Sequence, residues 1–269
     1  MSTSTTSPFD VLTINTLDDV TEVVHGIFKA SHTRWWFRGH ANANWDLQPK
    51  IWRGYDEQTE RYLTNLFYQR AKLRHARFPD DNDYAGWLAL MQHYGLPTRL
   101  LDWSDSVLIA AYFAIKYDRD MSRKGAAQDA AIWMLDPAGL NEAEDYGAVF
   151  PSLNATSLGP IIQSAFKDLT RAAATDPATP KYDVLAAVPV NHDLRMVMQQ
   201  GAFTVHATPQ LLNAHPTCGR WLKKLVIPAR CVARMDLSLD MLGLRLSDVF
   251  PDLHHLAIDL MNIHRPKTV

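Results

Sequence analysis

Apolar side chains recur every three or four residues along several stretches of the chain, a spacing that predicts amphipathic helices. The predicted helices cover residues 20–28, 56–77, 84–94, 106–117, 160–174 and 251–263, with another near Leu239. In the helix over residues 56–77, one face gathers the apolar side chains Tyr62, Leu63, Leu66, Phe67 and Leu73.

Residues with capping chemistry mark the ends of three of these helices. Asp56 and Asp83 each precede a predicted helix, and Ser104 or Asp105 precedes the helix over residues 106–117. Short polar side chains at these positions accept hydrogen bonds from the first free backbone N–H groups. Gly95 is expected to end the helix over residues 84–94, because glycine adopts the left-handed conformation of a helix end.

Runs of bulky and β-branched side chains predict strands over residues 35–38, 130–135, 184–190, 202–206 and 222–227. Residues 118–129 and 175–180 are predicted loops. Strands and helices are interspersed without a regular alternation, which favours an α+β fold with a central mixed or antiparallel sheet and flanking helices. We expect a disordered lead over residues 1–15 and a single domain over residues 16–269.

Composition narrows the class of protein. The chain has 269 residues, 47% of them hydrophobic, and a formal charge of -2, which does not indicate a nucleic-acid binder but leaves room for a local basic groove. Its two cysteines cannot form a zinc site alone, and the pair Gln92–His93 has no second ligand at a suitable spacing, so no metal is expected. The longest apolar run, residues 107–115, is shorter than the roughly 20 residues of a membrane span. We therefore expect a cytoplasmic protein without a membrane partner.

Arg38 is the first candidate for chemistry, because it follows a run of aromatic residues and precedes Gly39. A guanidinium offers a planar fork of donors to phosphate or carboxylate, and glycine permits close approach of a ligand. Arg53 is a candidate second cation for the same ligand. The alternative is structural: the stem of Arg38 packs on a tryptophan and its head pairs with a carboxylate.

A second candidate region spans residues 93–103, where ionisable and aromatic groups surround a glycine and a proline. Its candidate residues are His93, Tyr94, Thr98, Arg99, Asp102 and Trp103. Loops of this composition usually lie at binding sites. The alternatives are that Asp102 pairs with Arg99 or caps the next helix, and that His93 is a structural histidine.

Two adjacent amides, Gln199 and Gln200, precede a predicted strand and form the third candidate region. Amides can read a nucleobase or a ribose through paired donors and acceptors, or they can satisfy a backbone edge. Arg195 is expected on the same surface. The sequence contains no phosphate-binding loop, no dinucleotide glycine motif, no nucleophile elbow and no His-Glu-x-x-His motif.

These segments, taken in order, resemble the FRG domain family, which is named after a Phe-Arg-Gly motif. The resemblance rests on residues 37–39, on the run from Gln92 to Trp103, on the Ala-Tyr-Phe-Ala helix at residues 111–114, and on residues 199–203 and 250–253. It covers roughly residues 30–260.

The chain also resembles the ADP-ribosyltransferases in the spacing of its segments. That resemblance implies an ADP-ribosyltransferase-like fold that uses NAD as substrate. It places Arg38 at the early NAD-binding position, residues 94–103 in the middle strand region and Gln200 at the late position, where these enzymes carry a glutamate. Because Gln200 is no carboxylate, either another group supports catalysis, with Asp102 the nearest candidate and Arg99 beside it, or the site binds without turnover.

Two functions follow as expectations. In the first, the protein transfers ADP-ribose from NAD to a nucleic acid or protein, as a toxin or phage-defence effector with an antitoxin partner. The NAD-binding residues would be Arg38, Gly39, Arg53, His93, Tyr94, Thr98, Trp103 and Gln199, and the catalytic residues Gln200, Asp102 and Arg99. In the second, the protein is a non-catalytic nucleotide- or RNA-binding module, in which arginines hold phosphate and aromatic rings stack on a base. An interaction scaffold built on Trp35, Trp36, Trp87 and Trp103 is a third possibility.

Overall fold

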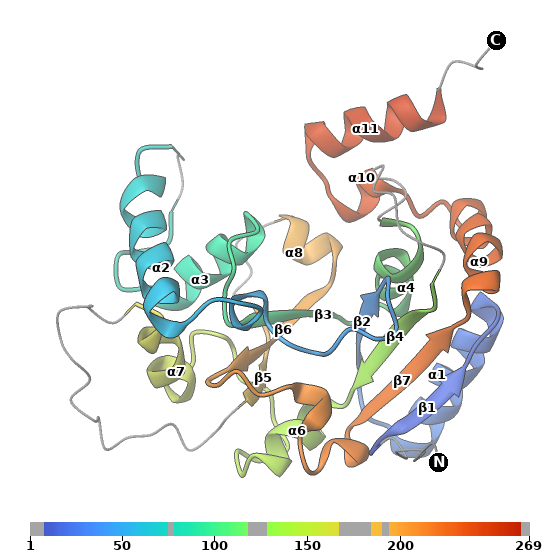
Figure 1. Cartoon of the computed structure of the whole chain (residues 1–269), viewed down its shortest axis with the longest axis horizontal. Helices are drawn as coiled ribbons and strands as arrows, with labels where there is room; N and C mark the ends of the chain where they lie inside the picture. Colours follow the sequence, from blue (N-terminus) through green and yellow to red (C-terminus); the bar gives the residue numbers. More distant parts are fainter. Residues whose placement is uncertain (1–7, 75–77, 118–127, 167–183, 190–193, 265–269) are drawn as a thin grey trace.

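One seven-stranded sheet organises the chain, and a computed structural model describes residues 8–74, 78–117, 128–166, 184–189 and 194–264 (Figure 1). The strands are β1 (Asp10–Thr13), β2 (Trp36–His40), β3 (Leu100–Ser104), β4 (Ala130–Leu135), β5 (Val184–Ala187), β6 (Gly201–His206) and β7 (Leu222–Ile227). Their order across the sheet is β1-β7-β4-β2-β3-β6-β5. Only β1 and β7 pair in parallel among these strands, so the sheet is mixed and mainly antiparallel.

The helices of the described residues surround this sheet. They are α1 (Leu17–Ser31), α2 (Glu57–Ala71), α3 (Tyr84–His93), α4 (Val107–Ile115), α6 (Pro137–Ala143), α7 (Gly159–Ser164), α8 (Leu194–Met198), α9 (Ala229–Met241), α10 (Leu246–Val249) and α11 (Leu253–Ile263). The predicted α+β class with a central mixed sheet and flanking helices is therefore confirmed. None of these helices has the length and apolar character needed to cross a membrane.

Each face of the sheet has its own core. On one face, α1, α4 and α9 pack on side chains such as Phe37, Ile132 and Leu225. On the other face, tryptophans dominate the core, among them Trp36, Trp103, Trp133 and Trp221. The tryptophans proposed for a scaffold, Trp35, Trp36, Trp87 and Trp103, are all buried. These four tryptophans belong to the core, so they do not form the exposed interaction surface that the scaffold hypothesis requires.

Several predicted boundaries are correct because local chemistry sets them. Asp56 and Asp83 accept backbone hydrogen bonds at the starts of α2 and α3, and Gly95 follows α3 with φ of 78°. The cap of α4 is Ser106, and the prediction of Ser104 or Asp105 is wrong. Ser104 cannot serve there because it ends β3.

The predicted disordered lead is wrong from residue 10 onward. Asp10–Thr13 forms β1, which pairs with residues 223–226 of β7, and Ile14 is buried. A four-residue edge strand with one polar end carries too weak a pattern to be recognised without its partner. The predicted loop over residues 175–180 and parts of the predicted loop at 118–129 and helix at 160–174 lie outside the described residues.

The fully buried positions of α2 are polar, while Leu63, Leu66 and Phe67 are half-buried. Tyr62 is exposed, as is Leu73 beyond the end of the helix, whereas the two buried residues of α2 are Glu60 and Thr64. The helix therefore turns a polar side toward the body of the protein. Its partner there is a buried arginine, which the sequence pattern cannot reveal.

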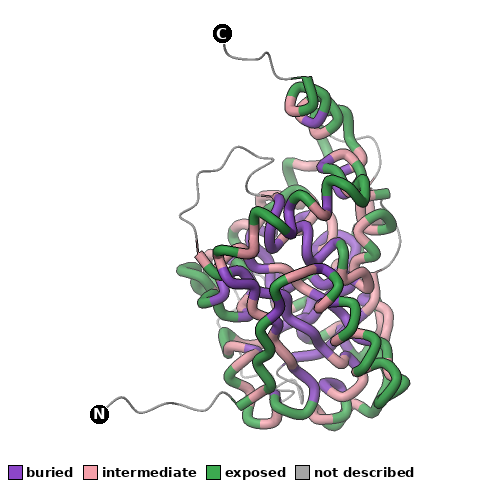
Figure 2. The backbone as a smooth tube through the Cα atoms, turned by 90° about the vertical axis from the view of Figure 1, so that its right-hand side faces the viewer, coloured by how far each residue is buried: buried purple, intermediate pink, exposed green. Residues whose placement is uncertain are grey.

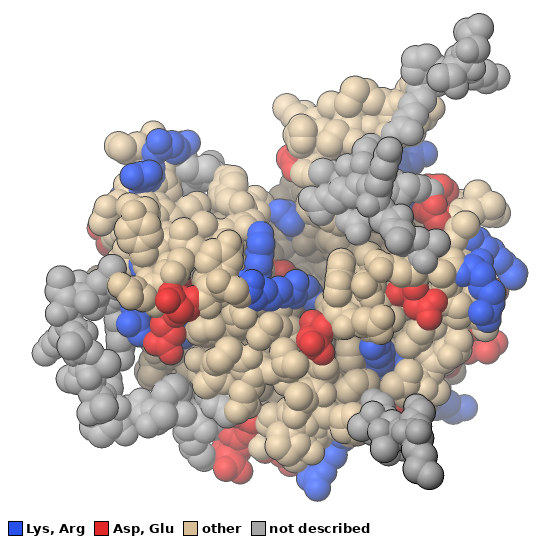
Figure 3. Space-filling model, viewed as in Figure 1, with Lys and Arg blue, Asp and Glu red and all other residues tan. Residues whose placement is uncertain are grey.

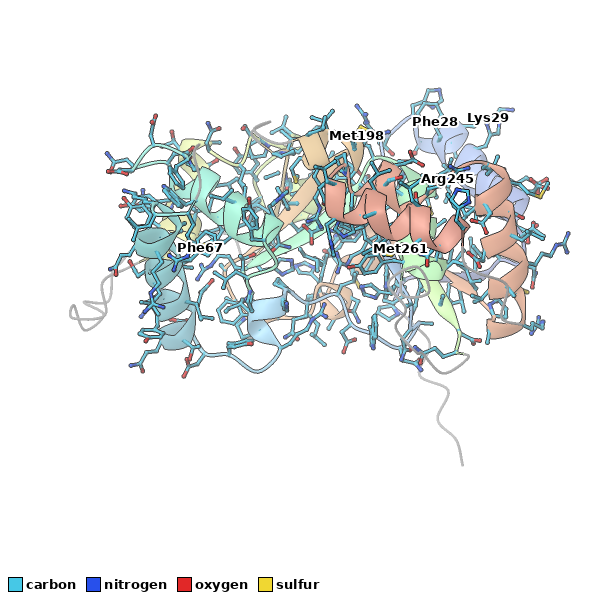
Figure 4. All side chains as sticks on the ribbon, turned by 90° about the horizontal axis from the view of Figure 1, so that it is seen from above. Phe28, Lys29, Phe67, Met198, Arg245 and Met261 are labelled. Atoms are coloured by element: carbon cyan, nitrogen blue, oxygen red, sulfur yellow. The ribbon has the colours of Figure 1, made fainter. Side chains whose placement is uncertain are left out.

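The last helix, α11, is largely exposed. In α11 most side chains are exposed, including Leu253, Leu260 and Met261 (Figure 2). Seen from above, α11 lies over the middle of the molecule, with Met261 on it and Met198 of α8 lying toward its other end (Figure 4). It contacts the body through Asp259, which accepts hydrogen bonds from Ser247 of α10, and through Ile258, which packs on the cluster of Tyr112 and Val249.

Candidate functional site

A cavity of about 190 Å³ opens where β2 and β3 separate. The two strands pair only at Phe37 and Ser104, so the following residues of β2 and the preceding residues of β3 are not joined by a strand ladder. The lining residues come from β2, β3, α3, α4 and α8: Phe37, Arg38, Gly39, Gln92, His93, Asp102, Trp103, Ser104, Ile109, Ala110, Phe113, Arg195, Met196 and Gln199. Figure 3 shows this face hollowed between α8 and α4, with basic side chains beside the hollow.

Arg38 crosses the gap between the two strands. Its Nη1 donates to the backbone oxygen of Asp102 at 2.7 Å, and its Nε donates to Nε2 of His40 at 3.0 Å. The carboxylate of Asp102 lies 4.0 Å from Nη1. Burial lowers the pKa of Arg38 to about 10, against the opposing effect of Asp102, so the guanidinium stays charged at neutral pH. Among the described residues, Nη2 has no hydrogen-bond partner and is left for a ligand.

Two buried histidines lie within the electric field of Arg38. Burial, together with charge repulsion from Arg38, lowers the pKa of His40 to about 2. Burial and Arg38 together lower the pKa of His206 to about 3. Both imidazoles are therefore neutral at physiological pH, and the lone pair on Nε2 of His40 holds the guanidinium in place.

Gly39 permits the close approach of another part of the chain to β2, and that part is the helix α4. A Cβ atom at this position would lie 2.0 Å from the backbone oxygen of Ala110 and 2.6 Å from the backbone nitrogen of Ala114. Glycine thus allows α4 to pack directly on β2. Gly39 also lines the cavity, so the predicted contact with a ligand remains a prediction.

The loop after α3 brings three polar side chains together. The end of α3 is a Schellman motif, in which Leu96 N–H donates to the oxygen of Met91 and Gly95 N–H to that of Gln92. The chain then returns, so that Oγ1 of Thr98 donates to Oε1 of Gln92 at 2.5 Å. Nε2 of Gln92 donates in turn to Oδ2 of Asp102 at 2.7 Å.

Arg99, which was predicted to be catalytic, does not line the cavity. Arg99 is 3% exposed and forms a bidentate ion pair with Glu60 on α2, through Nε at 2.9 Å and through Nη2. Its Nη1 donates to the backbone oxygen of Ile161 at 2.7 Å. Arg99 joins β3, α2 and α7 away from the cavity. The alternative pairing of Asp102 with Arg99 is wrong for the same reason.

Gln200, also predicted to be catalytic, lies outside the cavity lining. It is exposed and adopts a φ of 46°. Its backbone oxygen accepts from Asp105 N–H at 2.9 Å. Gln199 does line the cavity, but its Nε2 donates to the backbone oxygen of Val249 at 3.1 Å. The side-chain amide of Gln199 therefore satisfies a backbone group, which is the structural alternative considered above.

Other candidates divide between the cavity and its surroundings. His93 and Trp103 line the cavity, whereas Tyr94 is exposed and Thr98 is buried behind Gln92. Arg53 does not line it, because its Nε and Nη2 both donate to the backbone oxygen of Gln48. The Arg53 charge nonetheless acts on Arg38 and His40, lowering the pKa of each.

Sequence reasoning missed three lining residues with useful chemistry: Gln92, Ser104 and Phe113. Gln92 begins the motif at residues 92–103, so its place in that motif was a usable signal. Arg195 lies where it was expected, on the cavity wall, with Nη1 donating to the oxygen of His93 at 2.9 Å and its guanidinium 4.5 Å from the ring of Phe250. No group of three potential metal ligands occurs within the described ranges.

Comparison with known families identifies the central part of the site. Residues 33–123 match the model of the FRG domain. The chain contains an FRG domain. Neither the curated proteins nor the solved structures yielded a match to this sequence. The matched range contains Arg38, Gln92 and Asp102, whereas Arg195 and Gln199 follow it.

The FRG domain match does not delimit a separate folding unit. It includes β2 and β3, but β2 pairs with β4 and β3 with β6, both outside the matched range. The sheet is therefore completed by later parts of the chain. The cavity likewise needs α8, which closes it with Arg195 and Met196.

Proposed function

We propose that the cavity of the FRG domain binds NAD and that the protein is an ADP-ribosyltransferase-like enzyme. The observation that supports this proposal is the placement of a cation and a carboxylate in one cavity: Arg38 and Asp102 both line it, 4.0 Å apart. A guanidinium suits the pyrophosphate of NAD, and a carboxylate suits the ribose that becomes positively charged during cleavage. Asp102 thus supplies the carboxylate that Gln200 lacks.

The reaction assigned to this pair breaks the bond between C1′ of the ribose and the nicotinamide nitrogen. Nicotinamide leaves with the bonding electron pair, and the ribose carries the resulting positive charge, which the Asp102 carboxylate offsets. A nucleophilic oxygen or nitrogen of the acceptor then bonds to C1′ and loses its proton to solvent. Arg38 holds the pyrophosphate throughout and takes no part in proton transfer.

The aromatic rings of the cavity support the binding of a flat base. Trp103 lines the cavity from a buried position, with Nε1 donating to Thr204 at 3.1 Å, and Phe113 lines it from α4. Tyr94, which is among the expected NAD-binding residues, is exposed and does not line the cavity. We assign the stacking contact to Phe113 and Trp103 instead.

A non-catalytic nucleotide- or RNA-binding module is the second candidate. It is supported by the two arginines of the cavity, Arg38 and Arg195, since two cations with aromatic neighbours suffice to hold a phosphate and a base. In this case Asp102 accepts hydrogen bonds from a ribose without promoting cleavage.

The deciding experiment incubates the purified protein with NAD labelled in the adenylate, with and without RNA, DNA and cell lysate. Released nicotinamide is measured by chromatography and transferred label by electrophoresis. We expect release with the wild-type protein and a loss of about 100-fold or more with Asp102→Asn, because removal of one electrostatic partner of a transition state has that effect. Arg70→Ala, on the exposed end of α2, serves as the control and should match wild type.

Tight nucleotide binding by calorimetry without release of nicotinamide would support the binding module and contradict the enzyme. Release that is unchanged in Asp102→Asn would contradict the assignment of the carboxylate. The roles of toxin or phage-defence effector, with an antitoxin partner, follow from the enzyme. Growth arrest on expression that Asp102→Asn abolishes would support them.

A further inference from the structure

The carboxylate of Asp102 is held by a directional chain of hydrogen bonds behind the cavity. The chain runs from the backbone of Leu100 through Thr98 and Gln92 to Asp102. All of its members belong to residues 92–102, so a single segment of the sequence contains the whole hydrogen-bond chain.

The direction of every hydrogen bond in this chain follows from its two ends, because the N–H of Leu100 can only donate and the carboxylate of Asp102 can only accept. Leu100 N–H donates to Oγ1 of Thr98 at 3.1 Å, which leaves the hydroxyl hydrogen of Thr98 free to be donated onward. That hydrogen goes to Oε1 of Gln92 at 2.5 Å. The amide of Gln92 is therefore fixed with its NH₂ group toward Asp102, and its two ends cannot be exchanged.

The consequence concerns the two oxygens of Asp102. Nε2 of Gln92 donates to Oδ2 at 2.7 Å, while Oδ1 accepts no hydrogen bond from any residue that the structure describes. On the main chain, the oxygen of Asp102 accepts from Arg38 at 2.7 Å. Asp102 is thus held at its backbone by Arg38 and at one carboxylate oxygen by Gln92, and its other carboxylate oxygen is left for a ligand.

We propose that Thr98 and Gln92 are positioning residues, which orient the Asp102 carboxylate so that Oδ1 accepts a hydroxyl group of the ligand. Thr98 is fully buried, so it acts only through Gln92. This proposal rests on the proposed function for its effect on catalysis. The orientation itself is a property of the free protein and is tested separately.

The test of orientation is NMR spectroscopy of the ¹⁵N-labelled free protein. The side-chain NH₂ signals of Gln92 are assigned by their loss in Gln92→Leu. In the wild type we expect one of these protons to be shifted downfield and to exchange with water at least tenfold more slowly than in exposed glutamines. Thr98→Ser should keep both features and Asp102→Ala should remove the downfield shift. Gln92 signals like those of an exposed glutamine would overturn the proposal.

The test of function compares kcat and KM for nicotinamide release. Gln92→Leu leaves the backbone bond of Leu100 intact, so it serves as the variant least disturbed in folding; Thr98→Val and Thr98→Ser form the matched pair. In Gln92→Leu and Thr98→Val we expect kcat to fall about tenfold, while KM for NAD changes less than twofold. Thr98→Ser keeps the hydroxyl group and should retain the wild-type kcat. Equal losses in Thr98→Val and Thr98→Ser, or unchanged kcat in Gln92→Leu, would overturn the role.

The two proposals fail in different ways. Suppose that the NMR signals show the oriented amide, but neither the wild type nor any variant releases nicotinamide. The enzyme proposal is then wrong, and the proposed orientation of Asp102 stands. If wild type releases nicotinamide and the NMR signals show a free amide, the enzyme proposal stands and the positioning proposal is wrong.

Discussion

Nη1 of Arg38 lies 2.7 Å from the backbone oxygen of Asp102, across the point where β2 and β3 part. The side chain of Arg38 thereby replaces the strand ladder that the two strands do not form. This arrangement keeps a charged guanidinium beside a cavity while satisfying part of its hydrogen-bonding capacity. It also connects the two candidate functional residues, so a substitution of either one is expected to shift the position of the other.

Replacement of Arg38 should show whether function depends on its positive charge alone or also on the geometry of its guanidinium group. Arg38→Lys keeps a positive charge, but an ammonium group cannot donate to His40 and Asp102 from the same fixed fork. We expect both Arg38→Lys and Arg38→Ala to lose about 100-fold or more of nicotinamide release or of nucleotide affinity. Measurement of both, with Arg70→Ala as control, checks this expectation. Full function in Arg38→Lys would show that only charge matters.

The buried pair of Arg99 and Glu60 should be important for stability and not for ligand binding. Arg99→Met leaves the Glu60 carboxylate buried without its partner, and we expect a loss of about 3–5 kcal/mol in the free energy of unfolding. The double variant Arg99→Met with Glu60→Met should be more stable than either single variant. Urea denaturation of the four proteins measures the effect, and additive losses would contradict the pairing.

A methyl group at Gly39 should disrupt the packing of α4 on β2. Because the added Cβ would meet backbone atoms of Ala110 and Ala114, which cannot move aside as a side chain can, we expect Gly39→Ala to lose at least about 1–3 kcal/mol of stability. Gly26 in α1 has open space around the same position, so Gly26→Ala should gain up to about 1 kcal/mol. Thermal unfolding of both variants tests the contrast, and equal melting temperatures would refute it.

Acid should destabilise the protein through two histidines. The pKa of His40 is lowered to about 2 and that of His206 to about 3, both from 6.5, so the unfolded chain binds more protons than the folded one below pH 6.5. Their stabilising contribution is complete above pH 6.5 and is lost as pH falls toward 3, by up to about 1.4 kcal/mol per pH unit for each histidine. Urea denaturation between pH 7 and 4.5 measures the slope.

The control for this pH dependence is His206→Gln, which keeps a polar group near Thr204, the hydrogen-bond partner of His206. Loss of one titrating group should reduce the slope contributed by the pair by about half. A slope identical to that of wild type would show that His206 does not contribute.

The sequence by itself determined the features that depend on near neighbours. The starts of α2 and α3 and the turn at Gly95 were predictable, because capping carboxylates and a left-handed glycine act within a few residues. The α+β class followed from the order of the apolar patterns, and the motif at residues 92–103 identified the segment that contains Asp102.

The tertiary structure alone decided which polar side chain of that motif faces the cavity. Arg99 and Asp102 are three residues apart on the same segment, yet Arg99 is buried against Glu60, which lies 39 residues earlier in the chain, while Asp102 lines the cavity with Arg38, 64 residues earlier. Gln200 was likewise turned away by the backbone bond to Asp105. A sequence pattern shows which face of an element a side chain occupies, but the neighbour on that face depends on how distant strands and helices pack.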